Sequence, residues 1–419
     1  MKSNYKRLGD YIHKVENRNK DSKVTELRGL SMTKEFRETT SNIVGTDMSV
    51  YKVMTKGQFA CDFMSVIRVH KFPVVLKTDE IPNLVSPAYP VFEVNNINEL
   101  HPEYLMMWFK RSEFDRYADF KCDSAIRGGF DWDALCDCYL PIPSPDKQHE
   151  IVKEYNVIQN RIVLNNELIA KLEETAQTIY KQWFVDFEFP DEKGKPYKSN
   201  GGKMVWCEEL EKDVPVGWEM ESFSILCDIG SSKRVYESEY KTSGIPFYRG
   251  KEITLKKNGL PITEPYYIST NRFDDLVEKY GNPIQGDILL TAVGTIGSSY
   301  MVGIEDFYFK DGNIIWLKNF IKKGLNYYVY DFMQTKMFDE LIEEITIGST
   351  QSAITITTLN EQQLITPTDQ VLNSYVEISK LLNQNRNLIV SENQKLLELN
   401  ELLLARMTKV ESEVETEER

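Results

Sequence analysis

The spacing of apolar side chains predicts two long amphipathic helices, one in each half of the chain. Ser144 is a suitable N-cap and Pro145 suits the first helical position, so we expect the first helix to begin there. Apolar positions then recur alternately every three and four residues, at Tyr155, Ile158, Ile162, Ile169, Leu172, Ala176, Ile179 and Trp183. We expect the second helix to follow Thr368 and to reach about Met407, with its stripe at Tyr375, Ile378, Leu382, Ile389, Leu396 and Leu403. This alternation indicates the seam of a coiled coil.

Asparagine interrupts each predicted seam, at Asn165 in the first helix and at Asn385 or Asn393 in the second. A polar residue in a seam lowers stability but fixes the register of the two helices. A lone amphipathic helix of about 40 residues is unstable in water because its apolar stripe stays exposed. We therefore expect the two helices to pack on each other as an antiparallel coiled coil. The alternative is that each helix pairs with another chain.

The segments before each helix are predicted to be globular and of mixed α/β or α+β class. Residues 104–117 and 327–342 have a helical pattern, and residues 284–302 suggest short strands with tight turns. Residues 349–357 are rich in β-branched side chains and predict a strand. Proline and glycine in the connector indicate irregular structure. The predicted organisation is a domain at 1–143, a helix at 144–187, a connector at 188–217, a domain at 218–367, a helix at 368–408 and an acidic tail at 409–419.

The two halves resemble each other at an offset of 224 residues. Identical residues recur at this offset in the globular parts and in the helices. They include Tyr104 and Tyr328, Phe114 and Phe338, Leu135 and Leu359, Pro143 and Pro367, and Lys171 and Lys395. The globular parts otherwise differ strongly. Two different domains on one repeated scaffold suggest a binder of a two-part target rather than a single catalytic pocket.

Charge along the chain is uneven, although the net charge is −14. Residues 1–78 hold 15 basic and 8 acidic side chains, and residues 231–260 hold 7 basic and 3 acidic ones. Local patches rather than the total charge set the affinity for phosphates. The start of each half could therefore contact a polyanion. The sequence has no long apolar run and no signal-peptide core, and its six cysteines are not paired in metal-binding spacings, so we expect a cytoplasmic protein with reduced thiols.

The sequence offers no self-contained catalytic centre. It has no phosphate-binding loop of the G-x-x-x-x-G-K-[ST] kind and no Asn-Pro-Pro-aromatic tetrapeptide of the kind amino-methylating enzymes use. The four histidines are scattered without ligand spacing. Four aspartates cluster between residues 123 and 137, and we interpret them as solvated turn residues rather than a metal site.

Several sequence runs together resemble the specificity (S) subunit of type I restriction-modification systems. The most specific is AQTIYKQWFVDFE at residues 176–188, which is similar to the end of the family's central helix. Further runs are GKPYK at 194–198, GGKMV at 201–205, VPVGW at 214–218, IPFYRG at 245–250, GDIL at 286–289, GSTQ at 348–351 and LLLARM at 402–407. The first domain departs from the family by lacking the GSTQ run, so the two domains are less alike there than the two helices are.

The resemblance implies two target recognition domains, each reading one half of a split double-stranded DNA site. It implies that the helices act as a spacer and as the platform for two methyltransferase (M) subunits, with restriction (R) subunits joining through M. S-adenosylmethionine, ATP and Mg would then belong to the partner subunits, with no cofactor and no metal in this chain. Residues predicted to face a partner are Trp183, Phe184, Asp186, Phe187 and Arg406.

The basic stretches supply the candidate DNA contacts, because Arg and Lys suit phosphates and guanine while Gln and Asn suit adenine. In the first domain they are Lys34, Arg37, Lys56 and Arg127; in the second they are Lys233, Arg234, Tyr248, Arg249, Lys251 and Gln351. Arg249 could instead hold the turn after the strand at Pro246. Two other functions stay open: a standalone DNA methyltransferase or nuclease fused to recognition domains, and a coiled-coil adaptor without a role on DNA. The base sequence that is read cannot be derived.

Overall fold

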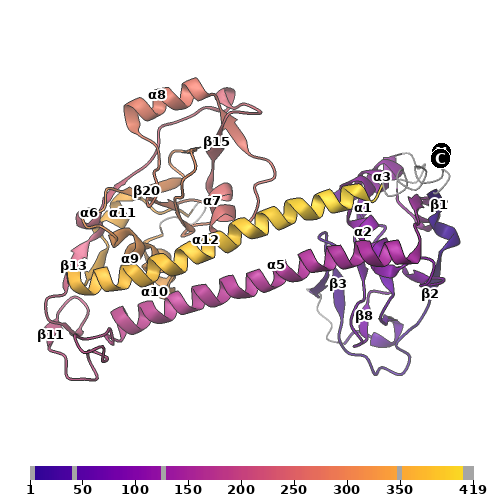
Figure 1. Ribbon diagram of the computed structural model, residues 1–419, viewed down its shortest axis with the longest axis horizontal. Helices are drawn as coiled ribbons and strands as arrows, with labels where there is room; N and C mark the ends of the chain where they lie inside the picture. The colour runs from indigo at the N-terminus through magenta and orange to yellow at the C-terminus, as the bar shows by residue number, and fades with distance from the viewer. Residues whose placement is uncertain (1–4, 40–44, 124–128, 347–351, 409–419) are drawn as a thin grey trace. The chain divides into compact units, whose positions relative to one another are not determined.

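The computed structural model describes residues 5–39, 45–123, 129–346 and 352–408 of the chain (Figure 1). Its contacts divide the chain into two units, which are Met1–Ile162 with Leu396–Arg419, and Val163–Lys395. We call them unit 1 and unit 2. Each unit holds one globular part together with portions of the long helices α5 (Pro145–Tyr180) and α12 (Asp369–Arg406).

Unit 1 is built on a four-stranded antiparallel sheet with the order β2-β9-β6-β7. The strands are β2 (Ile12–Val15), β6 (Phe59–Cys61), β7 (Val74–Leu76) and β9 (Val91–Val94). Helices α2 (Pro102–Lys110) and α3 (Ser112–Asp123) share its core, in which Phe59, Phe72, Phe92 and Phe109 are fully buried. Smaller pairs are β1 (Tyr5–Arg7) with β10 (Tyr139–Pro141), β3 (Arg28–Leu30) with β4 (Phe36–Glu38), and β5 (Lys52–Met54) with β8 (Asn83–Val85).

Unit 2 contains a sheet of the same topology, with the order β14-β20-β17-β18. Its strands are β14 (Asp228–Gly230), β17 (Ile288–Thr291), β18 (Ser299–Met301) and β20 (Ile314–Lys318). Helices α9 (Leu325–Phe332) and α10 (Lys336–Ile345) correspond to α2 and α3, and β13 (Glu219–Ser222) pairs with β21 (Gln363–Thr366) as β1 pairs with β10. Unit 2 adds a three-stranded sheet and two helices: β15 (Ile245–Tyr248), β16 (Tyr266–Ile268), β19 (Tyr308–Phe309), α7 (Gly250–Lys257) and α8 (Thr270–Tyr280).

Matching residues confirm the internal repeat. The buried Tyr104 hydroxyl donates to the carbonyl of Pro141 at 3.0 Å, and the buried Tyr328 hydroxyl donates to the carbonyl of Ile365. Both donors and both acceptors are 224 positions apart. Leu135 on α4 (Trp132–Cys136) and Leu359 on α11 (Ile356–Glu361) are likewise fully buried at equivalent places. The halves therefore share one core and differ in what they add to it.

Within unit 2 the two long helices run antiparallel and meet along the predicted seam. The Asn165 side chain donates to Asn393 Oδ1 at 2.8 Å, and Asn393 donates to Asn166 Oδ1 at 2.9 Å. Further along, Arg386 pairs with Glu173 at 2.6 Å. Of the two asparagines considered for the second seam, Asn393 is therefore the seam residue, since Asn385 is exposed and bonds within its own helix. The prediction that the helices pair with each other is confirmed.

Two local predictions were wrong. The connector contains a hairpin of β11 (Met204–Cys207) and β12 (Lys212–Pro215), because Val214 and the following Trp218 are buried in the core of unit 2. The turn of this hairpin contains no glycine, and Glu211 takes its positive φ. Residues 349–357 do not form a strand over their described part. Thr355 caps α11 by accepting from the amide of Thr358 at 3.0 Å, which starts a helix at Ile356. Only Ala353 keeps strand-like pairing among residues 352–357, in a bridge to Val293.

Candidate nucleic-acid interface

Arg249 holds the turn between β15 and α7. Its amide donates to Glu252 Oε2 at 2.9 Å, and its guanidinium donates to the same carboxylate at 2.8 and 3.1 Å. The guanidinium also lies 4.1 Å from the ring centroid of Tyr266. Hydrogen bonding from the nearly buried Glu252 raises the pKa of Arg249. These contacts match the alternative prediction for Arg249, in which it supports the turn after the strand and does not contact DNA.

The Tyr248 side chain is buried, and its hydroxyl bonds to a neighbouring carboxylate. Its hydroxyl donates to Glu305 Oε2 at 3.3 Å, where Lys256 also donates at 2.5 Å, and Tyr300 donates to the second oxygen at 2.7 Å. Burial raises the pKa of Tyr248 above its usual value. Because Tyr248 is 5% exposed, this DNA contact predicted from sequence is corrected to a packing role.

A more open surface lies where α7 meets the turn that follows β17. The hydroxyls of Thr254 and Thr295 are 2.7 Å apart, and the Thr291 hydroxyl bonds to the carbonyl of Thr295 and accepts from the amide of Ser298 at 3.0 Å. Lys251, Gly294 and Thr295 are exposed here. A Cβ on Gly294 would meet open space. The surface presents the Lys251 ammonium and the Thr254 hydroxyl of α7 beside the Thr295 hydroxyl, which lies on a turn held by internal hydrogen bonds.

Sequence reasoning selected Lys251 on this surface and missed Thr254 and Thr295. The signal available was the Gly294–Gly297 pair, which the sequence marked only as a turn. The other two basic residues predicted for unit 2 are exposed. Arg234 pairs with Asp311 at 3.1 Å, and the Lys233 ammonium lies 5.0 Å from the ring centroid of Tyr280.

The residues predicted in unit 1 differ in exposure. Lys34 is buried, where its ammonium pairs with Asp115 at 2.7 Å and donates to the carbonyl of Phe109. Burial lowers the pKa of Lys34, and Asp115 opposes that shift. The prediction that Lys34 contacts DNA is therefore wrong, because its ammonium forms an ion pair within the domain. Arg37 and Lys56 are exposed, the first bonded to the carbonyl of Leu30 at 3.1 Å and the second paired with Glu80 at 2.7 Å.

Two predicted contacts, Arg127 and Gln351, lie outside the described residues, as does the acidic tail at 409–419. The strand-like residue Ala353 nevertheless bridges to Val293 and so ties the described start of that segment to the turn after β17. The amide of Ile354 adds a bond to the carbonyl of Ala292 at 3.0 Å.

Three of the five residues predicted to face a partner are core residues of unit 2. Trp183, Phe184 and Phe187 are at most 7% exposed and pack around Tyr375 and Trp218. The aromatic end of the predicted first helix thus packs in the core of unit 2, and a partner has no access to these rings in this arrangement. The prediction that these three residues face a partner is therefore wrong, because the aromatic side chains at this helix end are buried in the core of unit 2.

Asp186 and Arg406 are accessible. Asp186 pairs with Lys181 at 2.7 Å, and Arg406 lines an apolar groove of about 560 Å³ in unit 1. The α5 and α12 side chains in this groove include Val157 and Leu402, both 62% exposed. Both residues lie outside the heptad seam. An apolar side chain on a helix face that the seam does not bury is therefore the sequence feature that could have indicated this groove. Such a groove suits a helix or strand of another protein.

The described residues place limits on other kinds of site. No group of three or more His, Cys, Asp or Glu side chains in them could hold a metal ion, and Asp131 is occupied in capping α4. Among the helices of the described ranges, none combines the length and apolarity needed to cross a membrane.

Comparisons with known proteins show which proteins this chain is similar to. Residues 215–401 match the family described as the Type I restriction modification DNA specificity domain. The chain is 22% identical over 296 residues to the type I restriction enzyme MjaIX specificity subunit of Methanocaldococcus jannaschii, which covers 69% of this chain and 65% of that protein. It is 29% identical over 227 residues to the putative type I restriction enzyme specificity subunit S.HindORF215P of Haemophilus influenzae, covering 50% of this chain and 52% of that protein. The chain thus spans about half to two thirds of the length of these relatives.

The fold has a solved counterpart. The crystal structure of the type I restriction-modification system S subunit from M. genitalium superposes with a TM-score of 0.56 at 13% identity, covering 96% of this chain and 95% of that one. At this identity the likeness concerns the fold, and it extends over both halves and both long helices. The matched domain lies in the second half of the chain, and the internal repeat carries the same core into the first half.

Proposed function

We propose that this chain is the DNA-specificity subunit of a type I restriction-modification complex. It binds a split double-stranded DNA site, with one recognition domain on each half-site. The observation that carries the proposal is the repeat, in which two copies of one core hold different additions on a single antiparallel helix pair. A two-part target read at a fixed separation calls for such an arrangement.

The charge of the exposed surface supports contact with a duplex. DNA-binding proteins use Lys and Arg on phosphates for position and side chains in the grooves for sequence. Arg37 and Lys56 in unit 1, and Lys233, Arg234 and Lys251 in unit 2, are exposed basic residues that lie in locally basic stretches of a chain with a net charge of −14. We assign these basic residues to contacts with DNA phosphates. We assign the Thr254 and Thr295 hydroxyls to contacts within the DNA groove next to the phosphate that Lys251 would bind.

Catalysis is assigned to partner subunits. The chain would hold two methyltransferase subunits on its helices and, through them, restriction subunits. S-adenosylmethionine, ATP and Mg²⁺ would be bound by those partners. The missing phosphate-binding loop and amino-methylation tetrapeptide support this division over a standalone methyltransferase or nuclease. The apolar groove beside Arg406, with exposed Val157 and Leu402, offers one docking surface for a partner.

The function can be tested with the purified chain and its methyltransferase partner. We expect the chain alone to bind duplex DNA with an affinity that falls steeply with salt, because bound Lys and Arg release counterions from phosphates. We expect it not to transfer methyl groups from S-adenosylmethionine to DNA until the partner is added. Sequencing of the methylated bases should then show one split site. The partner alone is the control.

Two results would point to the other functions. Methyl transfer by the chain alone would indicate a fused enzyme. Binding that is absent at every salt concentration, together with an unmethylated genome in the presence of the partner, would indicate an adaptor without a role on DNA.

A second prediction separates a structural lysine from a phosphate contact. Lys34→Met leaves the half-buried Asp115 carboxylate without its cation, although the Phe72 amide still donates to it. We therefore expect the free energy of unfolding to fall by about 3 kcal/mol, the lower end of the cost of breaking a buried pair. Lys251→Gln should leave the melting temperature unchanged. It should instead weaken binding to all sequences and lower the slope of log affinity against log salt by about one. Calorimetry and salt titrations of both variants check this, and a stable Lys34→Met protein with a lowered salt slope would reverse the assignment.

A further inference from the structure

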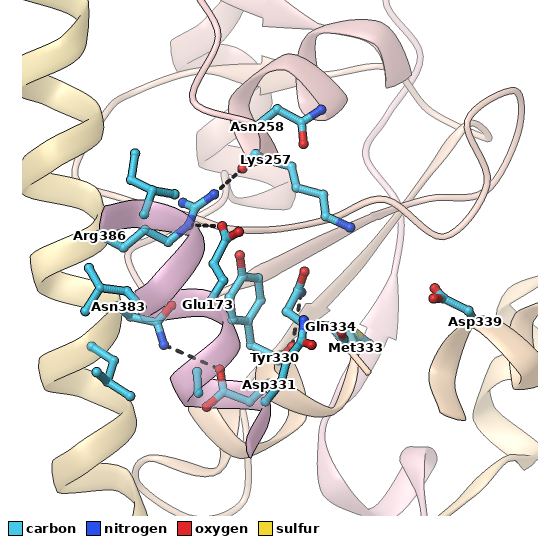
Figure 2. A pocket seen from close by; sticks show the side chains of 15 residues that line it. Glu173, Lys257, Asn258, Tyr330, Asp331, Met333, Gln334, Asp339, Asn383 and Arg386 are labelled. Atoms are coloured by element: carbon cyan, nitrogen blue, oxygen red, sulfur yellow. Dashed lines mark hydrogen bonds and ion pairs between the residues drawn. The ribbon is translucent and has the colours of Figure 1, made fainter. Parts of the chain in front are cut away.

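The second recognition domain is attached to α12 by a buried carboxylate. Asp331 lies on α9 and is 4% exposed. Its Oδ2 accepts from the Tyr375 hydroxyl at 2.7 Å and from the Ser379 hydroxyl. Its Oδ1 accepts from the Asn383 amide at 3.4 Å (Figure 2). The three donors are four residues apart, so they lie on one face of α12 over successive turns. One side chain of the domain thus engages two turns of the helix.

The same face of α12 continues to a second polar contact. Arg386 donates to Glu173 of α5 at 2.6 Å and to the carbonyl of Lys257, the last residue of α7, at 2.6 Å (Figure 2). Asp331, Asn383, Arg386, Glu173 and Lys257 all line a cavity of about 350 Å³. Directional polar contacts thus line this cavity, while Tyr328 of α9 and Tyr375 of α12 belong to the apolar core beside it.

Unit 1 joins its domain to its helix differently. The position equivalent to Asp331 is Met107, and those equivalent to Tyr375 and Ser379 are Ile151 and Tyr155. All three are buried side chains of the apolar core of unit 1. Apolar contacts tolerate small sliding because they have no direction, whereas a buried carboxylate that loses its donors is left unsatisfied. Hydrogen bonds also join α2 to α5 in unit 1, from Lys110 to the Tyr155 hydroxyl at 3.0 Å and from Asn156 to Glu103 at 2.6 Å, so what distinguishes the junction in unit 2 is its buried carboxylate.

We infer that Asp331 is a positioning residue, which fixes the register of the second recognition domain on α12 and so restricts the gap between half-sites to one length. The inference rests on the proposed function. Burial raises the pKa of the Asp331 carboxyl and the three donors oppose that shift, which agrees with a group held by its hydrogen bonds. The expected defect on removing it is a loss of spacing discrimination, with both half-sequences still read.

The test uses the full complex and a set of duplexes that carry the cognate half-sites with the cognate gap or a gap one base pair shorter or longer. For the unaltered complex, the ratio of methylation at altered gaps to that at the cognate gap gives the reference. Asp331→Leu removes every acceptor, and we expect this ratio to rise about fivefold, the equivalent of one net hydrogen bond. Asp331→Asn keeps one acceptor oxygen and should raise the ratio less. If Asp331→Leu does not fold, Asp331→Asn carries the test.

Leu325→Ala is the matched control, because Leu325 is fully buried on α9 but makes no polar contact to α12. It should lower the melting temperature without altering the ratio. A ratio that stays at the reference value in folded Asp331 variants, or that rises equally in Leu325→Ala, overturns the positioning role. Failure of the proposed function is distinguishable, since the unaltered complex would then methylate no split site at any gap.

Discussion

Replacing residues 1–143 with the corresponding domain of another specificity subunit is expected to change one half of the methylated sequence entirely and to leave the other half unaltered. The reason is that the core, the pairing of β1 with β10 and the entry to α5 recur in both halves, while the added strands and loops do not. A domain from another protein that has the same core should therefore pack on the long helices in the same way. Sequencing of methylated bases in a host that carries the hybrid and the methyltransferase partner measures the outcome.

The junction and the control follow from the structure. The Gln148 side chain on α5 donates to the carbonyls of Glu99 and Pro143 at 2.8 and 2.9 Å and accepts from the amide of His101, so a donor domain has to offer equivalent carbonyls. The reciprocal replacement of residues 218–367 should change the other half only. A hybrid that alters both halves of the site at once would show that the domains do not read DNA independently.

Lengthening both helices by four residues is expected to lengthen the gap between the half-sites by one or two base pairs without changing either half-sequence. Four residues advance an α-helix by about 6 Å and turn it by about 40°. Stacked base pairs are about 3.4 Å apart. The insertions belong after Glu167 in α5 and after Ser391 in α12, between the Asn165–Asn393 bond and the Glu173–Arg386 pair, so that both contacts are kept. Methylation mapping of the active variant gives the gap.

The same insertion in α5 alone serves as the control. It moves Asn165 one turn away from Asn393 while Glu173 stays opposite Arg386, so it should lower the melting temperature and the activity rather than produce a longer gap. An unaltered gap in a folded complex with both insertions would mean that the helices do not determine the spacing.

The helices and the repeat could be predicted from the sequence because both depend on periodic side-chain identity. A heptad stripe specifies which helix face is buried, and the pairing of Asn165 with Asn393 follows once two such stripes must cover each other. The connector hairpin and the helix at Ile356 could not be predicted, since glycine content and β-branched residues describe local preference. Burial of Trp218 and capping by Thr355 decided the outcome in these segments.

The candidate site was predicted less well because residue type does not report exposure. Lys34 and Lys251 are both lysines in basic stretches, yet the first is paired in the core and the second is on the surface. What separates them is Asp115, which is 81 residues from Lys34 in the sequence. Trp183 and Phe184 likewise gave no sign of whether the core or a partner would cover them. Contacts of this kind depend on the tertiary fold.

If the proposed function holds, the presence of two recognition domains in one polypeptide has an evolutionary consequence. Homodimers that bind DNA through a two-fold axis read inverted repeats, because the same residues meet both half-sites. A duplicated core inside a single chain removes that constraint, and each copy can mutate or be exchanged by recombination while the other is retained. The number of sites open to such a lineage is then the product of the available first and second domains rather than their sum. Exchange at Pro143 and Pro367, each two residues before the start of α5 or α12, would leave a continuous scaffold.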